Sequence, residues 1–260
     1  MLEFPIGGKV ALVGGRLAAA ILSRYEWHDV EAPVGYEGSS KIEALFGPGI
    51  WDQIAGKTVL DFGCGHGREA IEVARHGAKH VIGLEIQEEH LATARAHQAA
   101  AGISNCTFVQ HFDSLADIIL SIDSFEHFSQ PAQVLEEMSR LLKPDGKVIV
   151  SFGPPWYHPK GGHFPLFVWA HLLLTEKSLM KWRSRFKHDG AMRFHEVAGG
   201  LNQMSIRKFE RLVANGPFRF EDFEAVPIRA ARRLHCYLTR EFFSSVVRCT
   251  LVQRSRSGRR

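Results

Sequence analysis

The sequence predicts an α/β fold, a doubly wound and mostly parallel sheet of seven strands with helices on both faces. From Lys57 to Gly153, short apolar runs alternate with segments whose apolar residues recur at helical spacing. One of these runs, 58–62, leads directly into glycine-rich sequence and then into a helix. After Gly153 the alternation stops, so we expect 154–204 to form a helical lid inserted before the last two strands.

We expect strands where apolar runs end at turn residues, and helices where apolar residues share one face. The predicted strands are 58–62, 80–85, 106–110, 117–122, 147–152, 218–226 and 245–253. The predicted helices are 68–76, 88–101, 131–142, 171–186 and 205–216. Gly77 and Gly102 suit left-handed helix ends, and Pro131 suits a first helical turn. By composition, 143–146 is a turn.

The composition is that of an ordinary globular chain, with 45% apolar and 23% charged residues, so a large core needs no disulfides. The net charge is +4. The arginines of the C-terminal tail supply all of it, namely Arg254, Arg256, Arg259 and Arg260. The near-neutral body argues against a nucleic-acid partner, which favours a basic face. We divide the chain into a helical and looped N-terminal cap (1–50), a main domain that contains the lid (51–253) and a disordered basic tail (254–260).

Four cysteines lie far apart along the chain: Cys64, Cys106, Cys236 and Cys249. They form no CxxC pair, as expected for a cytoplasmic protein in a reducing environment. The apolar stretch 10–23 is interrupted by Arg16 and a glycine pair, so it makes a poor signal peptide. No apolar run approaches the roughly 18 residues that a membrane span needs. We expect a monomer or a homodimer.

A glycine-rich motif, Asp61-Phe-Gly63-Cys-Gly65-His-Gly67, follows the strand 58–62 and opens a helix. Glycines allow a tight turn and a close approach of the backbone to a ligand, and a helix N-terminus offers unpaired N–H groups. A dinucleotide-binding loop would have its third glycine at the position of Arg68. A carboxylate beside the loop would repel a pyrophosphate, whereas it suits a cationic ligand.

Glu85 ends the second predicted strand, where a carboxylate can accept hydrogen bonds from both hydroxyls of a ribose. With these residues in place, the sequence resembles the class I S-adenosylmethionine (SAM)-dependent methyltransferases, in particular the small-molecule branch with its ubiquinone- and menaquinone-pathway enzymes. The matching pieces cover roughly 57–152 and are 59–67, 81–85, 117–127 and 140–146.

The resemblance implies a Rossmann-like sheet with an antiparallel last strand, SAM as the cofactor and S-adenosylhomocysteine (SAH) as its product. It also implies that the glycine loop lines the methionine end of SAM and that Glu85 holds the ribose. The implied cofactor contacts are Asp61, Gly63, Cys64, Gly65, Gly67, Glu85, Ile86, Asp113, Ile122 and Tyr36. We interpret Cys64 as a small residue that fills the loop rather than as a nucleophile.

The chain departs from this family between two predicted strands, where only residues 111–116 lie. A parallel crossover normally needs a dozen residues or more. The family usually has a helix there, preceded by an acidic residue that binds the adenine amino group, and Asp113 is the residue that could replace it. Either one strand is shorter than predicted, or the adenine pocket is more open than usual.

Asp123, Glu126 and His127 follow the fourth predicted strand at a spacing that would put them on one face of a helical turn. Three interpretations stay open. His127, with Glu126, could act as general base on the acceptor. The trio resembles the metal ligands of ubiquinone-pathway O-methyltransferases and small-RNA 2′-O-methyltransferases, although we expect no metal. Alternatively, Glu126 and His127 only fix the loop by hydrogen bonds.

The segment 153–165 follows the fifth predicted strand and is rich in turn and aromatic residues. His158 and His163 within it are candidate catalytic bases. Aromatic side chains of the lid are expected to wall the acceptor pocket and would suit an aromatic acceptor. These are Trp156, Tyr157, Phe164, Phe167 and Trp169.

The sequence therefore predicts an enzyme that transfers a methyl group from SAM to a small organic acceptor. Transfer to oxygen is favoured over nitrogen or sulfur, by in-line displacement with a histidine as a possible base. Two alternatives stay open, a methyltransferase that acts on RNA or protein, and a SAM-binding protein without transfer activity.

Overall fold

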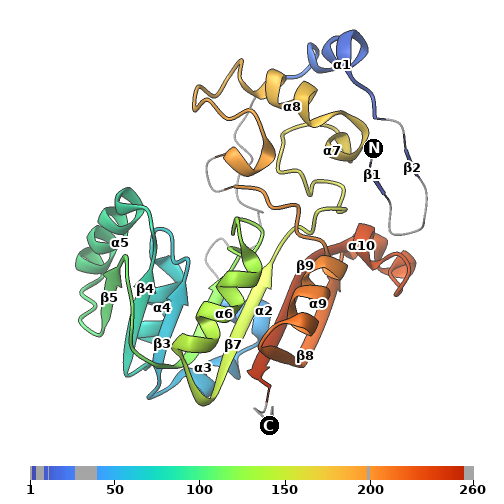
Figure 1. Ribbon diagram of the computed structural model, residues 1–260. Coiled ribbons are helices and arrows are strands. Elements are labelled where there is room, and N and C mark those ends of the chain that lie inside the picture. Colours follow the sequence, from blue (N-terminus) through green and yellow to red (C-terminus); the bar gives the residue numbers. More distant parts are fainter. Residues whose placement is uncertain (1, 4–8, 11, 27–39, 198–199, 255–260) are drawn as a thin grey trace, which may run out of the picture.

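The computed structural model describes residues 2–3, 9–10, 12–26, 40–197 and 200–254 (Figure 1). Its centre is a seven-stranded sheet in the order β5-β4-β3-β6-β7-β9-β8. The strands are β3 (Thr58–Phe62), β4 (His80–Leu84), β5 (Cys106–Val109), β6 (Ala116–Ile122), β7 (Leu142–Phe152), β8 (Phe218–Pro227) and β9 (Ser244–Gln253). Strands β3 to β7 are parallel, and β9 is antiparallel to both of its neighbours. The predicted fold class and the antiparallel last strand are confirmed.

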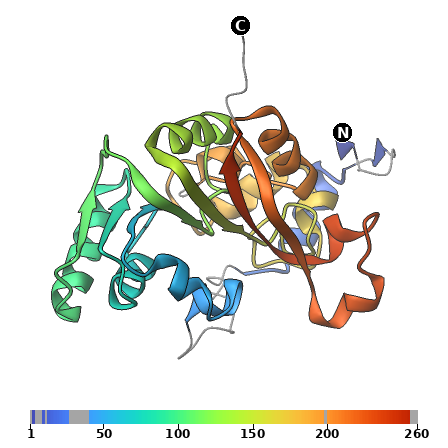
Figure 2. The same cartoon turned by 90° about the horizontal axis from the view of Figure 1, so that it is seen from below.

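Helices cover both faces of the sheet (Figure 2). One face carries α2 (Lys41–Phe46), α3 (Ile50–Ile54), α4 (Arg68–Arg75) and α5 (Glu88–Ala101), and the other carries α6 (Pro131–Leu141) and α9 (Ile206–Asn215). Along β3 the buried side chains alternate, with Val59 in the cluster beneath α4 and Leu60 in the cluster beneath α6. This alternation is the period of two that a strand imposes, and it buries both faces of the sheet.

Two elements differ from the prediction. The expected helix 171–186 is divided into α7 (Ala170–Leu173) and α8 (Glu176–Arg183). The chain leaves the helical path because Leu174 forms a bridge with Val13, and the Thr175 side chain caps α8 by accepting a hydrogen bond from Ser178 N–H. Strand β7 begins earlier than expected, and the predicted turn 143–146 lies within it as an irregularity of the pairing with β6.

The connection from β5 to β6 has no helix. Residues 110–115 cross β4 and β3 in an open loop, so the sheet face opposite α5 lacks the helix expected for this family (Figure 2). Phe112 of this loop packs against the core cluster that contains Ile82 and Leu84, and both of these remain buried. Strands β5 and β6 have nearly the predicted lengths, so the short connection is not explained by a strand that was predicted too long.

The inserted segment has a core of its own above the carboxyl ends of the strands (Figure 1). Trp156, Phe164 and Trp182 are buried there, together with residues of α1 (Gly15–Leu22) and of the 3-10 helix η1 (Phe194–Glu196). The N-terminal helix α1 thus packs on the lid, whereas α2 and α3 pack beneath the sheet. The boundaries of cap, lid and tail stay a prediction, and 255–260 lie outside the described residues.

The hairpin between β8 and β9 contains the 3-10 helix η2 (Arg229–Leu234) and α10 (Arg240–Phe243). A short pair of strands, β1 (Leu2–Glu3) and β2 (Lys9–Val10), lies apart from the main sheet. Among the described residues, no helix is both long enough and apolar enough to cross a membrane.

Gly83 in β4 offers a test of this packing. A Cβ atom on Gly83 would lie 2.4 Å from Cδ1 of Phe108 and 2.8 Å from Sγ of Cys64. We expect Gly83→Ala to lower the free energy of unfolding by about 1–3 kcal/mol, measured by urea denaturation.

The added variant Phe108→Leu should restore part of this loss in a double-mutant cycle, since the smaller side chain vacates the contact. Gly49→Ala is the control, because nothing lies within 4 Å of a Cβ at Gly49. Equal effects of Gly83→Ala and Gly49→Ala would contradict the proposed close packing.

Candidate functional site

The glycine loop lies between the carboxyl end of β3 and the first turn of α4. Gly63, Gly65 and Gly67 have φ angles of 81°, 49° and 75°, which favour residues without a Cβ. The N–H groups of Gly63 and Cys64 donate to the carbonyl of Leu84 at 2.9 and 3.1 Å, which fixes the loop against the end of β4. A loop of this shape leaves its surface free of side chains, so a ligand can approach the backbone.

Glu85 ties the loop to the segment after β4. Its carboxylate accepts hydrogen bonds from Gly65 N–H at 3.1 Å and from Gln87 N–H at 3.0 Å, and its side chain is 10% exposed. The next residue, Ile86, is 81% exposed. The carboxylate of Glu85, a hydrogen-bond acceptor, and the apolar surface of Ile86 therefore lie side by side at the edge of the loop. This arrangement suits a ribose and a flat base.

Asp61 is the most unusual group of the site. It lies near the end of β3, is 2% exposed, and its Oδ2 atom has no hydrogen-bond partner among the described residues. Burial, followed by the nearby charge of Glu69, raises the pKa of Asp61 to about 8. A buried carboxylate oxygen without a partner fits the amino group of a cationic ligand such as SAM.

Lys41 of α2 was not singled out in the sequence, yet it lies in the site. Its Nζ atom is 2.6 Å from Asp123 Oδ2 and 3.4 Å from Glu69 Oε1. These carboxylates raise the pKa of Lys41 against the opposing effect of burial. The only sequence signal is the helix start at Ser40, whose side chain accepts a hydrogen bond from Glu43 N–H.

The other predicted cofactor contacts lie in different surroundings. Cys64 is buried against the loop, and burial raises the pKa of its thiol, in keeping with a space-filling role. Ile122 ends β6 and is buried, whereas Asp113 is exposed on the β5–β6 loop. Tyr36 lies outside the described residues.

Glu126 and Asp123 lie on the loop after β6. Glu126 is buried, with Oε1 accepting from Gly153 N–H at 3.1 Å and Oε2 without a partner among the described residues. Burial, and then the charge of Asp123, raises the pKa of Glu126 to about 8. Asp123 instead pairs with Lys41, so the two carboxylates do not share one partner.

His127 and His163 are brought together by the lid, with ring centroids 5.9 Å apart. Nδ1 of His127 lies 2.7 Å from the carbonyl oxygen of Gly200. A carbonyl can only accept, so the proton resides on Nδ1, and Nε2 keeps a lone pair that can accept a proton. Burial lowers the pKa of His163 to about 4, so this ring is neutral at pH 7.

His158 lies on the same segment, and its Nδ1 accepts a hydrogen bond from Lys160 N–H at 3.0 Å. Burial lowers its pKa to about 4 as well. Within the described part of the chain, no three His, Cys, Asp or Glu side chains are arranged to hold a metal ion. Asp123, one member of the trio with Glu126 and His127, is paired with Lys41 instead.

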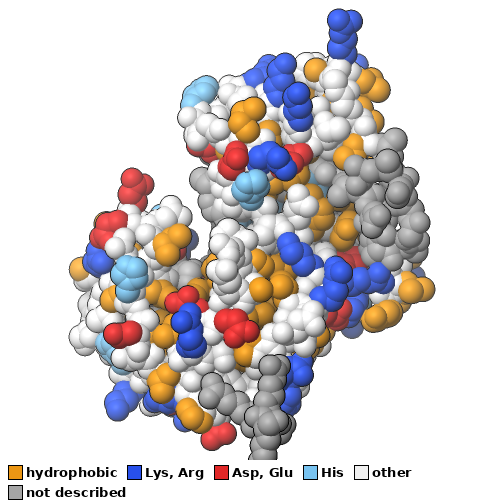
Figure 3. Space-filling model, in the orientation of Figure 1, with side chains coloured by type: hydrophobic (Ala, Val, Ile, Leu, Met, Phe, Trp, Pro, Cys, Tyr) orange, Lys and Arg blue, Asp and Glu red, His pale blue; other side chains and the backbone are white. Residues whose placement is uncertain are grey.

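Asn202 closes the site from the lid. Its amide donates to the carbonyls of Phe125 and Phe128 at 2.7 and 2.8 Å, and its backbone N–H donates to the Glu126 carbonyl. The residue thus braces the loop after β6 against the lid. Figure 3 shows the molecular surface hollowed between this lid and the part that carries α5.

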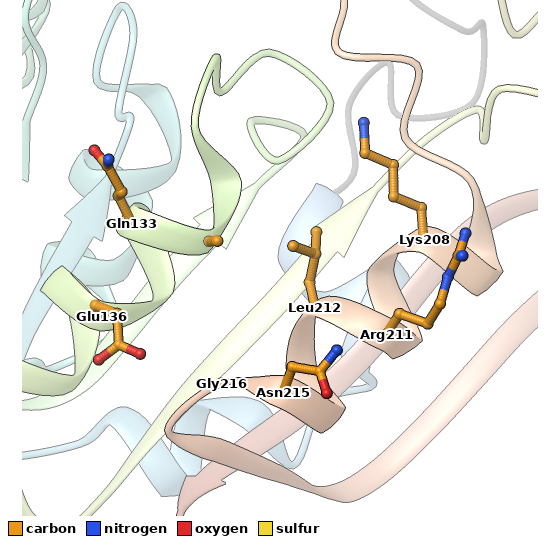
Figure 4. Close-up of a pocket in the computed structure, with 8 residues that line it drawn as sticks. Gln133, Glu136, Lys208, Arg211, Leu212, Asn215 and Gly216 are labelled. Atoms are coloured by element: carbon orange, nitrogen blue, oxygen red, sulfur yellow. The ribbon is translucent and has the colours of Figure 1, made fainter.

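A separate groove of about 410 Å³ lies between α6 and α9 (Figure 4). Its walls include Gln133 and Glu136 of α6 and Lys208, Arg211 and Asn215 of α9. None of the groups described above lines it, so it is distinct from the site at the glycine loop.

Comparison with known proteins agrees with this geometry. A family model described as a methyltransferase domain matches residues 54–154. The ubiquinone biosynthesis O-methyltransferase of Neisseria meningitidis is 31% identical over 144 residues, which are 52% of this chain and 57% of that protein. The enzyme of the same name from Pseudomonas paraeruginosa is 37% identical over 105 residues, 38% of this chain and 45% of that protein. The chain therefore spans about half the length of these relatives.

A solved SAM-dependent methyltransferase of Mesorhizobium loti has the same fold, with a TM-score of 0.51 and 18% identity. The alignment covers 77% of this chain and 92% of that one. The matched domain carries the glycine loop, the acidic residue that ends β4 and the loop after β6. Residues 54–154 thus match a methyltransferase domain, and the sheet of this chain has the fold of a solved SAM-dependent methyltransferase.

Proposed function

We propose that the protein transfers a methyl group from SAM to a small organic acceptor, with oxygen favoured as the acceptor atom. The observation that carries the proposal is a buried Asp61 oxygen that has no partner in the described structure, beneath a loop of glycines. It is supported by relatives named O-methyltransferases. The sulfonium of SAM makes its methyl group electrophilic, so the protein has mainly to align the acceptor and exclude water.

Each end of SAM finds a group of matching chemistry. Asp61 suits the ammonium of the methionine moiety, and Glu85 can exchange its backbone donors for the ribose hydroxyls. Lys41 is the cation near Asp61 in the described structure and suits the methionine carboxylate. We infer that Lys41 gives up part of its pairing with Asp123 when it binds that carboxylate.

His127 is the base that the geometry favours. Its Nδ1–H is held by the Gly200 carbonyl, so Nε2 is oriented as a proton acceptor. His163 adjoins it and stays neutral at pH 7, so it adds no competing positive charge. Glu126 and His158 complete the set of candidate catalytic groups.

The acceptor that we infer is small and has an aromatic part. Trp156 and Phe164 belong to the lid core, and Tyr157 and Trp169 are only partly buried beside them. We further infer a cytoplasmic enzyme, because Cys64, Cys106 and Cys249 are buried free thiols and Cys236 is an exposed one.

Binding of SAH offers a test of Asp61. The raised pKa, about 8, means that Asp61 is mostly protonated at pH 7 and must ionise to pair with an ammonium. We expect binding at pH 7 to release nearly a full proton, seen by calorimetry in buffers of different ionisation enthalpy. The affinity for SAH should rise as the pH increases toward 8. The number of protons released on binding should fall over the same range, because Asp61 is then increasingly ionised before SAH binds.

Asp61→Asn should abolish the proton release, whereas Asp52→Asn, on the exposed side of α3, should leave it intact. Heats that do not depend on the buffer at pH 7 would contradict the assignment of Asp61.

The proposed contact of Lys41 with the methionine carboxylate is tested with two ligands, only one of which carries that carboxylate. SAH carries the amino-acid moiety, and 5′-methylthioadenosine lacks it. We expect Lys41→Met to weaken SAH binding about tenfold or more, the loss of one charge-assisted hydrogen bond, and to leave methylthioadenosine binding unchanged. Lys41→Arg should retain most of the SAH affinity. An equal loss for both ligands would show that Lys41 acts only on the structure.

The activity itself is tested by SAH formation from SAM and a panel of phenols and small acids. With the best acceptor, His127→Ala or His163→Ala should lower kcat by ~10²-fold or more and leave SAH affinity nearly unchanged. His188→Ala, on the exposed lid surface, is the control. Full turnover in both of the first two variants would refute the general base, and SAH binding without any turnover would leave only a SAM-binding protein.

A further inference from the structure

The tip of the β8–β9 hairpin, residues 229–240, combines exposed apolar side chains with positive charge. Leu234, Tyr237 and Leu238 are 61%, 69% and 65% exposed. Helix η2, at the start of the tip, buries none of its residues. A stretch that places three large apolar side chains in water without building a core is typical of a surface that binds a partner.

The charges of the tip are all of one sign. Arg229, Arg232 and Arg233 are exposed, and none of them forms an ion pair with another described residue. Arg240 is the exception, since it pairs with Glu210 and lies over the Tyr237 ring. The sequence 229–240 contains no acidic residue, so the tip presents uncompensated positive charge.

The base of the hairpin is anchored by hydrogen bonds and by packing on the lid core. The buried Glu241 accepts hydrogen bonds from the N–H groups of Ile206 and Arg207 at 3.0 and 2.8 Å. Phe242 packs against the lid core, with its ring 5.6 Å from that of Tyr157. The tip therefore projects from an anchored base (Figure 2).

We propose that this tip docks on a membrane surface that contains anionic lipids. Leucine and tyrosine side chains partition into the interface between headgroups and acyl chains, while arginines beside them pair with phosphate groups. A membrane accommodates a convex tip, whereas a protein partner usually contacts roughly 20–30 residues on each side. The aliphatic side chains favour a lipid surface over a nucleic acid, which would be bound by charge and stacking.

The position of the tip has a consequence for the site. Strand β8 runs parallel to β7, because both are antiparallel to β9, so the hairpin lies at the sheet edge that also carries the glycine loop. If the proposed function holds, docking would turn the edge of the sheet where the methyl acceptor binds toward the lipid. The docking itself does not depend on that function.

Sedimentation with vesicles tests the proposal. The wild-type protein should bind vesicles of phosphatidylcholine mixed with phosphatidylglycerol, and added salt should weaken this binding. Vesicles of phosphatidylcholine alone should bind it far less. The charge reversal Arg232→Glu/Arg233→Glu should reduce the partition coefficient by about 25-fold or more, at about fivefold for each arginine lost. Leu234→Ser/Leu238→Ser should reduce it about tenfold.

Matched controls lie at the opposite, amino-terminal edge of the sheet. Lys57→Glu/Lys79→Glu reverses two exposed charges there, and Leu115→Ser removes an exposed leucine; both should bind as the wild type does. Each variant is first shown to keep the wild-type thermal stability and SAH affinity. The assay needs no methyl acceptor, so its failure is distinct from a failure of the proposed function.

Three results would overturn the proposal. The first is equal binding of the wild type to both kinds of vesicle, or to neither. The second is wild-type binding by the Arg232→Glu/Arg233→Glu variant. The third is tight binding of single-stranded RNA that the arginine changes abolish and the leucine changes do not, which would assign the tip to nucleic acid.

Discussion

The burial of the Asp61 carboxylate beneath a loop of glycines is the constraint on which the rest of the site depends. An ionised carboxylate in an apolar interior is costly unless it is paired. The backbone N–H of Ala70 and the charge of Lys41 lower this cost, whereas Glu69 and Glu85 increase it. The acid lies near the end of β3, where no neighbour among the described residues satisfies both of its oxygens. A cationic ligand at the glycine loop would complete that environment, so we expect the site to favour SAM over a pyrophosphate.

The shape of the loop depends on two neighbouring strands, β4 and β5, as well as on its own glycines. The end of β4 holds Gly63 and Cys64 through one carbonyl, and Glu85 holds Gly65. Phe108 of β5 fills the space beside Gly67, where a Cβ would lie 2.5 Å from its ring. A change in the packing of β5 would therefore be transmitted to the cofactor loop, although no side chain of β5 bears a charge.

The sequence predicts a helix or strand correctly where the contacts of that element repeat along it. The apolar run 58–62 coincides with β3, which is buried on both faces of the sheet. The segment 88–101 coincides with α5, because its alanines favour a helix and Gly102 ends it. The glycine loop was found because it follows a strand directly. The sequence does not reveal the role of Lys41, because its partners come from distant parts of the chain. The predicted helix 171–186 is too long, because the pairing of Leu174 with Val13 leaves no local sequence pattern.

The short connection after β5 changes how the two ends of a cofactor would be held. Without a helix on that face, Ile86 and Asp113 are exposed, so an adenine bound there would keep much of its contact with water. Burial stabilises in proportion to the apolar area removed from water, and the adenine end would then contribute less to affinity than in a closed pocket. On the proposed function, the methionine and ribose ends would contribute more, through the buried Asp61 and the largely shielded Glu85.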